Sequence, residues 1–142
     1  MVPDLETGGL VLALEPLETQ YTNLVTSTRE ARDIADSVGS SAVGITLDTH
    51  FLRWEQEVRG LSIREAFEIA GGCLAHLHIQ DDNRRAPGMG GWDFAPFLAA
   101  VGEIGWKGYL SLETFMAETL EEAEQVARRG IEYFRSLRHP SC

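Results

Sequence analysis

Four ionisable residues that could bind a metal follow short apolar segments at similar intervals along the chain: Glu15, Asp48, His78 and Glu113. Three carboxylates brought together without a cation would repel one another and raise one another's pKa values. A divalent cation would relieve this repulsion. Carboxylate oxygens with one imidazole suit Mn²⁺, Mg²⁺ or Co²⁺ better than a structural zinc site, which favours Cys and His. The four residues therefore predict a carboxylate-rich metal site, provided that the fold brings them together.

Each of these residues also has an ordinary explanation when it is taken alone. A single acidic residue at the end of a strand is more often structural than functional. A single histidine near an apolar strand is more often a packed core residue than a ligand. The prediction therefore depends on the recurrence of the pattern in four successive units. His76 lies two residues before His78 and on the same face of its segment; it either supports the site or packs beside it, and we leave it outside the ligand set.

The elements that must position these residues follow from the apolar patterns. Runs of apolar residues predict four strands, over residues 10–14, 43–47, 74–79 and 109–112. Apolar residues at helical spacing predict helices over residues 23–38, 62–70, 94–101 and 119–138. Ser62 with Glu65 matches a capping box, and Asp93 is a suitable N-cap. Residues 51–60 are predicted to be an irregular, charged connection.

This order of elements is four successive βα units. It predicts an α/β fold with parallel strands in one domain that covers residues 1–142. In a parallel sheet, or in an arc of a barrel, the carboxyl ends of neighbouring strands lie side by side, and ligands bind there. The four ionisable residues are therefore expected to converge, although they lie far apart in the sequence.

Composition restricts the function further. The chain has 142 residues, of which 44% are hydrophobic, and its formal net charge is −10. This acidity argues against binding to a nucleic-acid backbone and favours a cation or a neutral substrate. Cys73 and Cys142 form neither a ligand spacing nor a disulfide framework, so a reducing compartment is expected. No segment reaches the roughly 18 apolar residues of a membrane span, and residues 1–6 lack the features of a signal peptide, which predicts a soluble cytoplasmic protein.

Several of these segments also resemble the sugar isomerase/epimerase family, which consists of xylose isomerase-like TIM barrels and includes the D-tagatose and D-psicose 3-epimerases. The resemblance is to the C-terminal half of the barrel and covers nearly the whole chain. Its most specific part combines a His-x-His strand with an Asn-Arg-x-x-Pro-Gly loop. The segments that carry it are Leu14-Glu15-Pro16-Leu17, Leu47-Asp48-Thr49, His76-Leu77-His78, Asn83-Arg84-Arg85-Ala86-Pro87-Gly88 and Tyr109-Leu110-Ser111-Leu112-Glu113.

The resemblance implies a role for each site residue. Glu15, Asp48, His78 and Glu113 would be the metal ligands, and Glu15 and Glu113 would also be the acid/base pair on opposite faces of the substrate. Arg84 would bind oxygens of the sugar. The implied reaction is metal-dependent epimerisation at C3 of a ketose, by proton abstraction and re-addition through an enediolate. Mn²⁺ is the expected metal, with Mg²⁺ or Co²⁺ as alternatives.

The chain departs from the family pattern at two positions. The family's epimerases usually carry a His three residues after the strand-end Asp, where this chain has Phe51, and His50 stands one position earlier. His50 is therefore either a substrate-binding residue or an ordinary loop histidine. Epimerases also tend to have a second Glu six residues after the first, where this chain has Tyr21.

The chain is also short for a barrel. A complete TIM barrel has about 250 residues and eight strands, whereas four strands are predicted here. The chain is thus expected to be a fragment, to close a barrel with a second copy, or to pair with a separate N-terminal half.

Two other functions remain open. A half-barrel could bind a metal or a partner without catalysis. An endonuclease IV-like phosphodiesterase belongs to the same superfamily but needs further His and Asp ligands, and residues 84–93 contain no His. A nucleotide-binding domain of the doubly wound type is disfavoured because no G-x-G-x-x-G turn follows the first strand.

Overall fold

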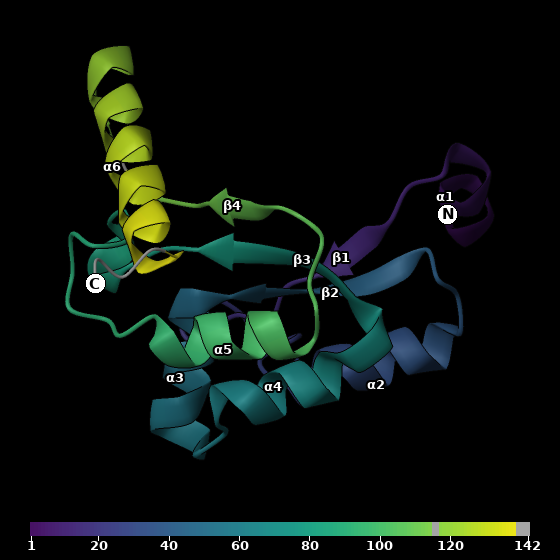
Figure 1. Cartoon of the computed structure of the whole chain (residues 1–142). Helices are drawn as coiled ribbons and strands as arrows, with labels where there is room; N and C mark the ends of the chain where they lie inside the picture. The colour runs from purple at the N-terminus through teal and green to yellow at the C-terminus, as the bar shows by residue number, and fades with distance from the viewer. Residues whose placement is uncertain (115–116, 139–142) are drawn as a thin grey trace.

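The predicted strands form one parallel sheet in chain order (Figure 1). The computed structural model describes residues 1–114 and 117–138. Each strand pairs in parallel with the next one along the chain. The predicted α/β fold of four successive βα units is therefore confirmed. The strands are β1 (Leu12–Leu14), β2 (Val43–Asp48), β3 (Leu74–Ile79) and β4 (Leu110–Leu112).

Helices connect the strands, as parallel pairing requires. In Figure 1, α2 to α5 lie together on one side of the sheet, whereas α1 lies beyond the start of β1 and α6 rises beside the end of β4. No helix in the part of the chain that the structure describes is long and apolar enough to span a membrane. The helices are α1 (Val2–Gly8), α2 (Thr28–Val38), α3 (Thr49–Arg59), α4 (Ile63–Ala70), α5 (Ala95–Glu103) and α6 (Leu120–Arg138), with short 3₁₀ turns η1 (Gly71–Cys73) and η2 (Asp82–Arg84).

The hydrophobic core lies between the sheet and these helices. Alternate residues of the two central strands point into it, and Phe67 of α4 packs edge to face with Phe97 of α5. The strand residues of the core are Ile45, Leu47, Leu77 and Ile79. Because side chains alternate along a strand, the residues between them, such as Thr46 and Asp48, project from the opposite face. The packing of the core thus fixes which residues face the candidate site.

The expectation of an irregular connection over residues 51–60 was wrong, because residues 49–59 form α3. Asp48 caps this helix by accepting a hydrogen bond from the His50 N–H at 2.7 Å. The helix buries Phe51, Leu52 and Glu55. The Glu55 carboxylate accepts hydrogen bonds from the backbone N–H and the hydroxyl of Thr28. A charged residue on the buried face interrupts the apolar pattern, and for this reason the sequence did not indicate a helix.

Two further helix boundaries differ from the predictions. Helix α2 begins at Thr28 rather than near residue 23, because the Ser27 side chain caps it by accepting the Glu30 N–H. Helix α1 was not predicted, and it buries no residue. By contrast, the capping box of Ser62 and Glu65 at the start of α4 is present as predicted. The expectation that Asp93 is the N-cap of the next helix was wrong, because the residue before α5 is Phe94, whose side chain makes no capping hydrogen bond, and Asp93 accepts the Ala95 N–H at 2.9 Å instead. Of the two predicted caps, only the one with a reciprocal Glu is therefore present.

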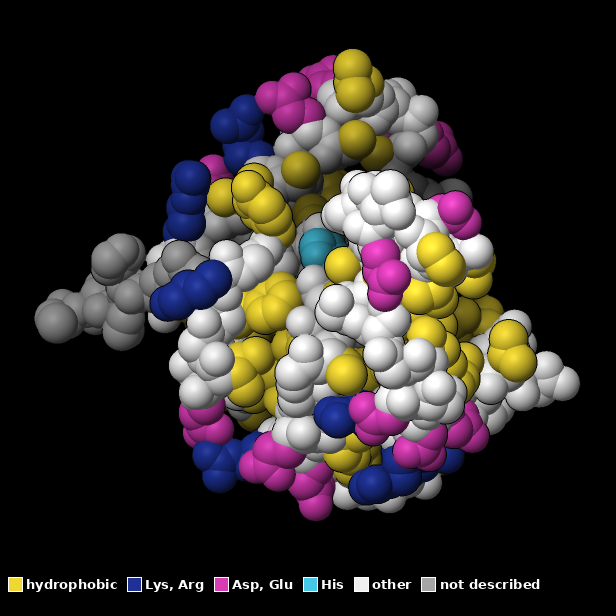
Figure 2. Space-filling view, turned by 90° about the vertical axis from the view of Figure 1, so that its right-hand side faces the viewer, with side chains coloured by type: hydrophobic (Ala, Val, Ile, Leu, Met, Phe, Trp, Pro, Cys, Tyr) yellow, Lys and Arg dark blue, Asp and Glu magenta, His cyan; other side chains and the backbone are white. Residues whose placement is uncertain are grey.

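The margins of the sheet leave apolar side chains in contact with solvent. Residues Leu10, Val11 and Leu12 at β1 are exposed, as is Tyr109 beside β4. Figure 2 views the molecule from the right-hand side of Figure 1, and hydrophobic side chains reach the surface across the middle of this view. Charged side chains gather mainly along its margins. Within the described residues, the sheet therefore has two unpaired edges, and both carry exposed apolar residues.

Candidate metal centre

The structure brings together the four residues that the sequence singled out. One ligand atom from each of them lies within 4.8 Å of the others. Glu15 follows β1, Asp48 ends β2, His78 is next to last in β3 and Glu113 follows β4. The carboxyl ends of the parallel strands therefore place the four side chains in one cluster, as the strand order predicts.

His78 lies at the centre of the contacts within this cluster. Its Nδ1 is 3.0 Å from Glu15 Oε1 and 2.7 Å from Glu113 Oε2. The hydrogen bond with Glu15 raises the pKa of the imidazole, as do the negative charges of Glu15, Glu113 and Asp48, whereas burial opposes this effect. Three carboxylates and one imidazole fit a hard divalent cation. In the protein without a cation, an imidazolium at His78 would offset part of the same negative charge.

Asp48 is the most deeply buried member of the cluster, at 2% exposed. Burial raises the pKa of its carboxyl, and the charges of Glu15 and Glu113 add to this effect. Hydrogen bonds from Gln80 Nε2 to Oδ2, at 2.8 Å, and from the His50 N–H to Oδ1 lower it. The carboxylate is thus held from two sides by donors that are not part of the cluster.

Arg84 lies beside the cluster and is framed by two aromatic rings. Its Nη1 is 3.6 Å from Glu113 Oε1. Its guanidinium carbon is 5.7 Å from the centre of the Tyr21 ring and 5.9 Å from that of Phe51, within the range of cation–π contacts. Tyr21 and Phe51 are the two positions at which the sequence departs from the epimerase pattern. In this chain their rings form an aromatic frame for the guanidinium.

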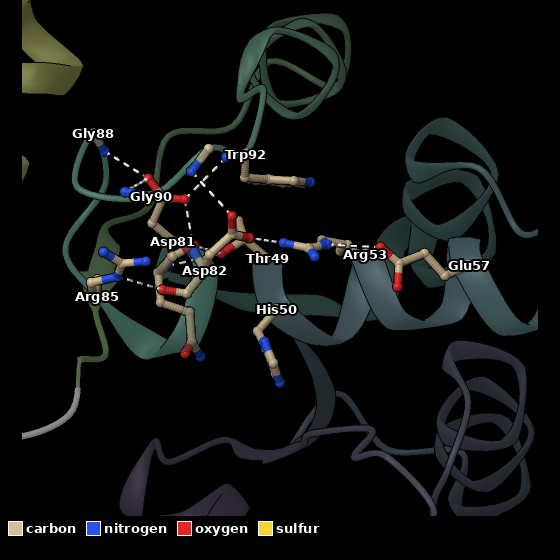
Figure 3. Close-up of polar contacts among 12 residues, drawn as sticks. Thr49, His50, Arg53, Glu57, Asp81, Asp82, Arg85, Gly88, Gly90 and Trp92 are labelled. Atoms are coloured by element: carbon tan, nitrogen blue, oxygen red, sulfur yellow. Dashed lines mark hydrogen bonds and ion pairs between the residues drawn. The ribbon is translucent and has the colours of Figure 1, made fainter.

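A buried carboxylate organises the loop that carries Arg84. The Asp81 side chain accepts hydrogen bonds from four backbone N–H groups: Oδ1 from Asp82 at 2.8 Å and Trp92 at 3.1 Å, and Oδ2 from Gly88 at 2.9 Å and Gly90 at 3.0 Å. Figure 3 shows this carboxylate enclosed by the loop backbone. A Cβ at Gly90 would lie 2.2 Å from Asp81 Oδ1, so a side chain does not fit there. The loop is therefore a defined structure, and the sequence indicated only a polar segment.

The backbone conformation of this loop is unusual at Arg84 itself. Asn83 and Arg84 have φ angles of 55° and 56°, in the left-handed region that residues other than glycine seldom adopt. Such conformations persist where the surroundings hold them. The Asp81 bonds, together with the ion pair between Asp82 and Arg53 of α3 (Figure 3), provide that restraint.

Among the residues that the structure describes, two other histidines lie outside the cluster of four. His50 Nε2 is 2.7 Å from Glu18 Oε1, and in Figure 3 the ring points away from the Asp81 loop. It lines a hollow of about 230 Å³ together with Arg53, Trp54 and Asp82, among others. His76 Nε2 is 2.7 Å from Ser111 Oγ, and its ring lies 5.1 Å from that of His78. The structure thus places both histidines beside the four-residue cluster rather than within it.

Sequence reasoning overlooked two residues that support the site, Gln80 and Asp81. Gln80 continues the alternation that places His76 and His78 on one face of the strand, so its position was open to prediction. Nothing in the sequence signals the partners of Asp81, since backbone groups of residues 82–92 supply them.

Comparisons with known proteins agree with this geometry. The profile of the xylose isomerase-like TIM barrel family matches residues 1–137. A D-psicose 3-epimerase from Enterocloster bolteae is 32% identical over 113 residues, which are 80% of this chain and 36% of the relative. An L-ribulose 3-epimerase from Mesorhizobium japonicum is 29% identical over 117 residues, which are 82% of this chain and 38% of the relative.

Solved structures show the same fold. The crystal structure of a D-psicose 3-epimerase in the presence of D-fructose superposes with a TM-score of 0.80 at 22% identity, and covers 92% of this chain and 50% of that one. A D-psicose 3-epimerase with D-tagatose from Clostridium cellulolyticum gives a TM-score of 0.79 at 24% identity, with the same coverage. The chain thus spans between about a third and half of the length of these proteins. It belongs to the xylose isomerase-like TIM barrel family, and its four strands correspond to half of such a barrel.

Proposed function

We propose that this chain is the metal-binding, proton-transferring half of a ketose 3-epimerase. The observation that carries the proposal is the convergence of Glu15, Asp48, His78 and Glu113 within 4.8 Å at the carboxyl ends of the strands. Relatives that bear the name D-psicose, L-ribulose or ketose 3-epimerase support the choice of reaction.

The four residues would hold one divalent cation, with Mn²⁺ first and Mg²⁺ or Co²⁺ as alternatives. Their donor set of carboxylate oxygens and a single imidazole supports this choice. A cation bound there would polarise the carbonyl group of a ketose and so make the neighbouring C–H group more acidic.

Glu15 and Glu113 would move the proton. They reach the cluster from β1 and β4, the two outermost strands, and so approach it from opposite ends of the sheet. One carboxylate would take the proton from C3, and the other would deliver a proton to the opposite face of the same carbon. This requires one of the two groups to be ionised and the other protonated at the start of each turnover. Glu15 and Glu113 both contact the His78 imidazole, so the charge of one carboxylate would influence the protonation of the other through this ring.

Arg84 and His50 would bind the substrate. The guanidinium of Arg84 stands beside Glu113, where its N–H groups could donate to oxygens of the sugar. His50 would act from the neighbouring hollow that it lines with Arg53 and Asp82. This hollow would bind a hydroxyl group at the end of the sugar that lies away from the metal site.

Turnover is proposed to require four further strands. β1 and β4 each pair with one neighbour within the described residues, whereas every strand of a closed barrel pairs on both sides. The additional strands would come from a second copy of this chain or from a separate N-terminal half-barrel. Either partner would cover the exposed apolar residues at the two edges.

Calorimetry tests the metal site first. Titration of the purified chain with MnCl₂ should show about one ion per chain, as expected for a four-residue site. A wild-type chain that binds none of Mn²⁺, Mg²⁺ or Co²⁺ would refute the site.

Proton exchange tests the reaction. A panel of ketoses is incubated in D₂O with Mn²⁺ and the chain, either alone or mixed with the half of a D-psicose 3-epimerase that this chain does not match. Deuterium should enter at C3, and Glu15→Gln should prevent it. Metal binding without exchange in any mixture would support a half-barrel that binds metal but does not catalyse.

A further inference from the structure

Gln80 follows β3 directly and is tied to the start of α3 by three hydrogen bonds. Its backbone N–H donates to Thr49 Oγ1 at 2.8 Å, and the Thr49 hydroxyl donates to the Gln80 carbonyl oxygen at 2.7 Å. Its side-chain Nε2 donates to Asp48 Oδ2 at 2.8 Å. Gln80 is 1% exposed. Both its backbone and its amide are therefore fixed relative to Asp48.

The Asp48 carboxylate is consequently restrained at both oxygens. The His50 N–H holds Oδ1 at 2.7 Å, and the Gln80 amide holds Oδ2. A carboxylate that is held at both ends cannot rotate about its terminal torsion, a motion that is otherwise soft. The directions of the lone pairs that remain are then fixed as well.

The orientation of the Gln80 amide follows from its surroundings. The reverse orientation would place Oε1, which can only accept, against an ionised carboxylate. In the orientation found, Oε1 is buried and has no hydrogen-bond partner among the residues that the structure describes. Burying an acceptor without a partner is unfavourable. The bond from Nε2 to Asp48 is the contact that offsets this penalty.

We propose that Gln80 is a positioning residue of the metal centre, which fixes the plane of the Asp48 carboxylate so that it points at Glu15, His78 and Glu113. This inference rests on the proposed function, because it assumes that a cation binds the cluster. Outer partners that orient metal ligands typically change metal affinity by about 10–100-fold. Gln80 is not one of the four cluster residues and would act through its bond to Asp48.

The test uses Gln80→Met, which keeps the length of the side chain but removes the donor. Thr49→Val is the matched control, because it removes the bonds to the Gln80 backbone and leaves the amide in place. Each protein is titrated with MnCl₂ by calorimetry at a temperature at which circular dichroism shows it to be folded. Gln80→Met should bind Mn²⁺ about 10–100-fold more weakly than the wild type. Thr49→Val should melt at a lower temperature but keep an affinity close to that of the wild type.

Electron paramagnetic resonance of the bound Mn²⁺ supplies a second readout. The spectrum of Gln80→Met should differ from that of the wild type, because a freed Asp48 carboxylate changes the symmetry of the site, whereas that of Thr49→Val should not. Gln80→Leu removes the same donor and replaces Gln80→Met if that variant does not fold.

Unchanged affinity and an unchanged spectrum in the donor-free variant would overturn the role of Gln80. An equal loss of affinity in Thr49→Val would also overturn it, because local packing would then be the cause. A wild-type chain that binds no Mn²⁺ would instead refute the proposed function, and the role of Gln80 with it.

Discussion

The central strands and the edge strands hold their site residues in different ways. β2 and β3 have six residues each and pair on both sides, and they present Asp48 and His78. β1 and β4 have three residues each and pair with one neighbour, and they present Glu15 and Glu113. Asp48 is almost fully buried and held by Gln80, whereas Glu113 exposes 39% of its side chain.

This contrast separates two parts of the proposed function. Contacts within this chain hold both residues of the central strands: the His50 N–H and Gln80 hold Asp48, and Glu15 and Glu113 contact His78. The outer carboxylates, to which we assign the proton transfer, lie on short strands at open edges. Metal binding should therefore depend mainly on the central pair, whereas turnover should depend on what completes the edges.

The strongest test of this contrast is to remove the charge of the central carboxylate. Asp48→Asn keeps the shape of the side chain, but an amide is a poor ligand for a divalent cation. We expect the Mn²⁺ affinity to fall by more than the roughly 10–100-fold that is typical when a residue that only orients a metal ligand is mutated. Calorimetry measures it, with Asp33→Asn on the exposed face of α2 as a control for the change in net charge. Equal affinities of the two variants would show that Asp48 is not a ligand.

A smaller effect is expected at the edge. Glu113→Gln should weaken Mn²⁺ binding by about tenfold, or about 1.4 kcal/mol, because this carboxylate is more exposed and its strand is short. The same variant should abolish deuterium incorporation at C3. The comparison of central and edge strands would be wrong if Glu113→Gln reduced metal affinity more than Asp48→Asn.

The sequence predicted the parts of the molecule that depend on local patterns. Apolar runs that end in ionisable residues located the four strands, and the ends of these strands located Glu15, Asp48, His78 and Glu113. Ser62 and Glu65 located the start of α4. In each case the signal lies within a few residues, because burial and capping both act at short range.

The sequence did not predict the contacts made between distant segments. Helix α3 was missed because Glu55 on its buried face depends on Thr28, which is 27 residues away. The bond from Gln80 to Asp48 spans 32 residues, and the framing of Arg84 requires Tyr21 and Phe51 from two other segments. A single sequence shows no pairing of this kind. The convergence of the four residues was therefore predictable, whereas the contacts that orient their side chains were not.

The Asp81 loop offers a test of how firmly the central region is held. In Gly90→Ala the new Cβ would meet Asp81 Oδ1 at 2.2 Å, so the Asp81 carboxylate or the loop backbone that bonds to it must shift. We expect a loss of about 1–3 kcal/mol in the free energy of unfolding, measured by urea denaturation. Gly72→Ala is the control, because nothing lies within 4 Å of a Cβ there. Equal stability of the two variants would show that the loop yields easily and does not fix Arg84.

The smallest expected effect concerns the contact between the central and the edge residues. The pKa of His78 is raised above 6.5, first by its hydrogen bond with Glu15. In the metal-free protein its contribution to stability is therefore fully present below the unfolded pKa of 6.5 and is lost as the pH rises through the higher folded value. Urea denaturation in EDTA from pH 6 upward should show this fall in the wild type, and the fall should be smaller in His78→Gln.

His76 provides a control of opposite sign for this measurement. Burial lowers the pKa of His76, and so does the charge of His78, so its contribution to stability grows as the pH rises. Because this change is complete by the unfolded pKa of 6.5, His76→Gln should remove a rise in stability at the acid end of the titration and leave the fall above pH 6.5 in place. Saturating Mn²⁺ should reverse the trend in the wild type, since a metal binds the neutral imidazole and is favoured by higher pH. If His78→Gln left the slope unchanged in EDTA, the imidazole would not contact the two edge carboxylates, Glu15 and Glu113, in solution.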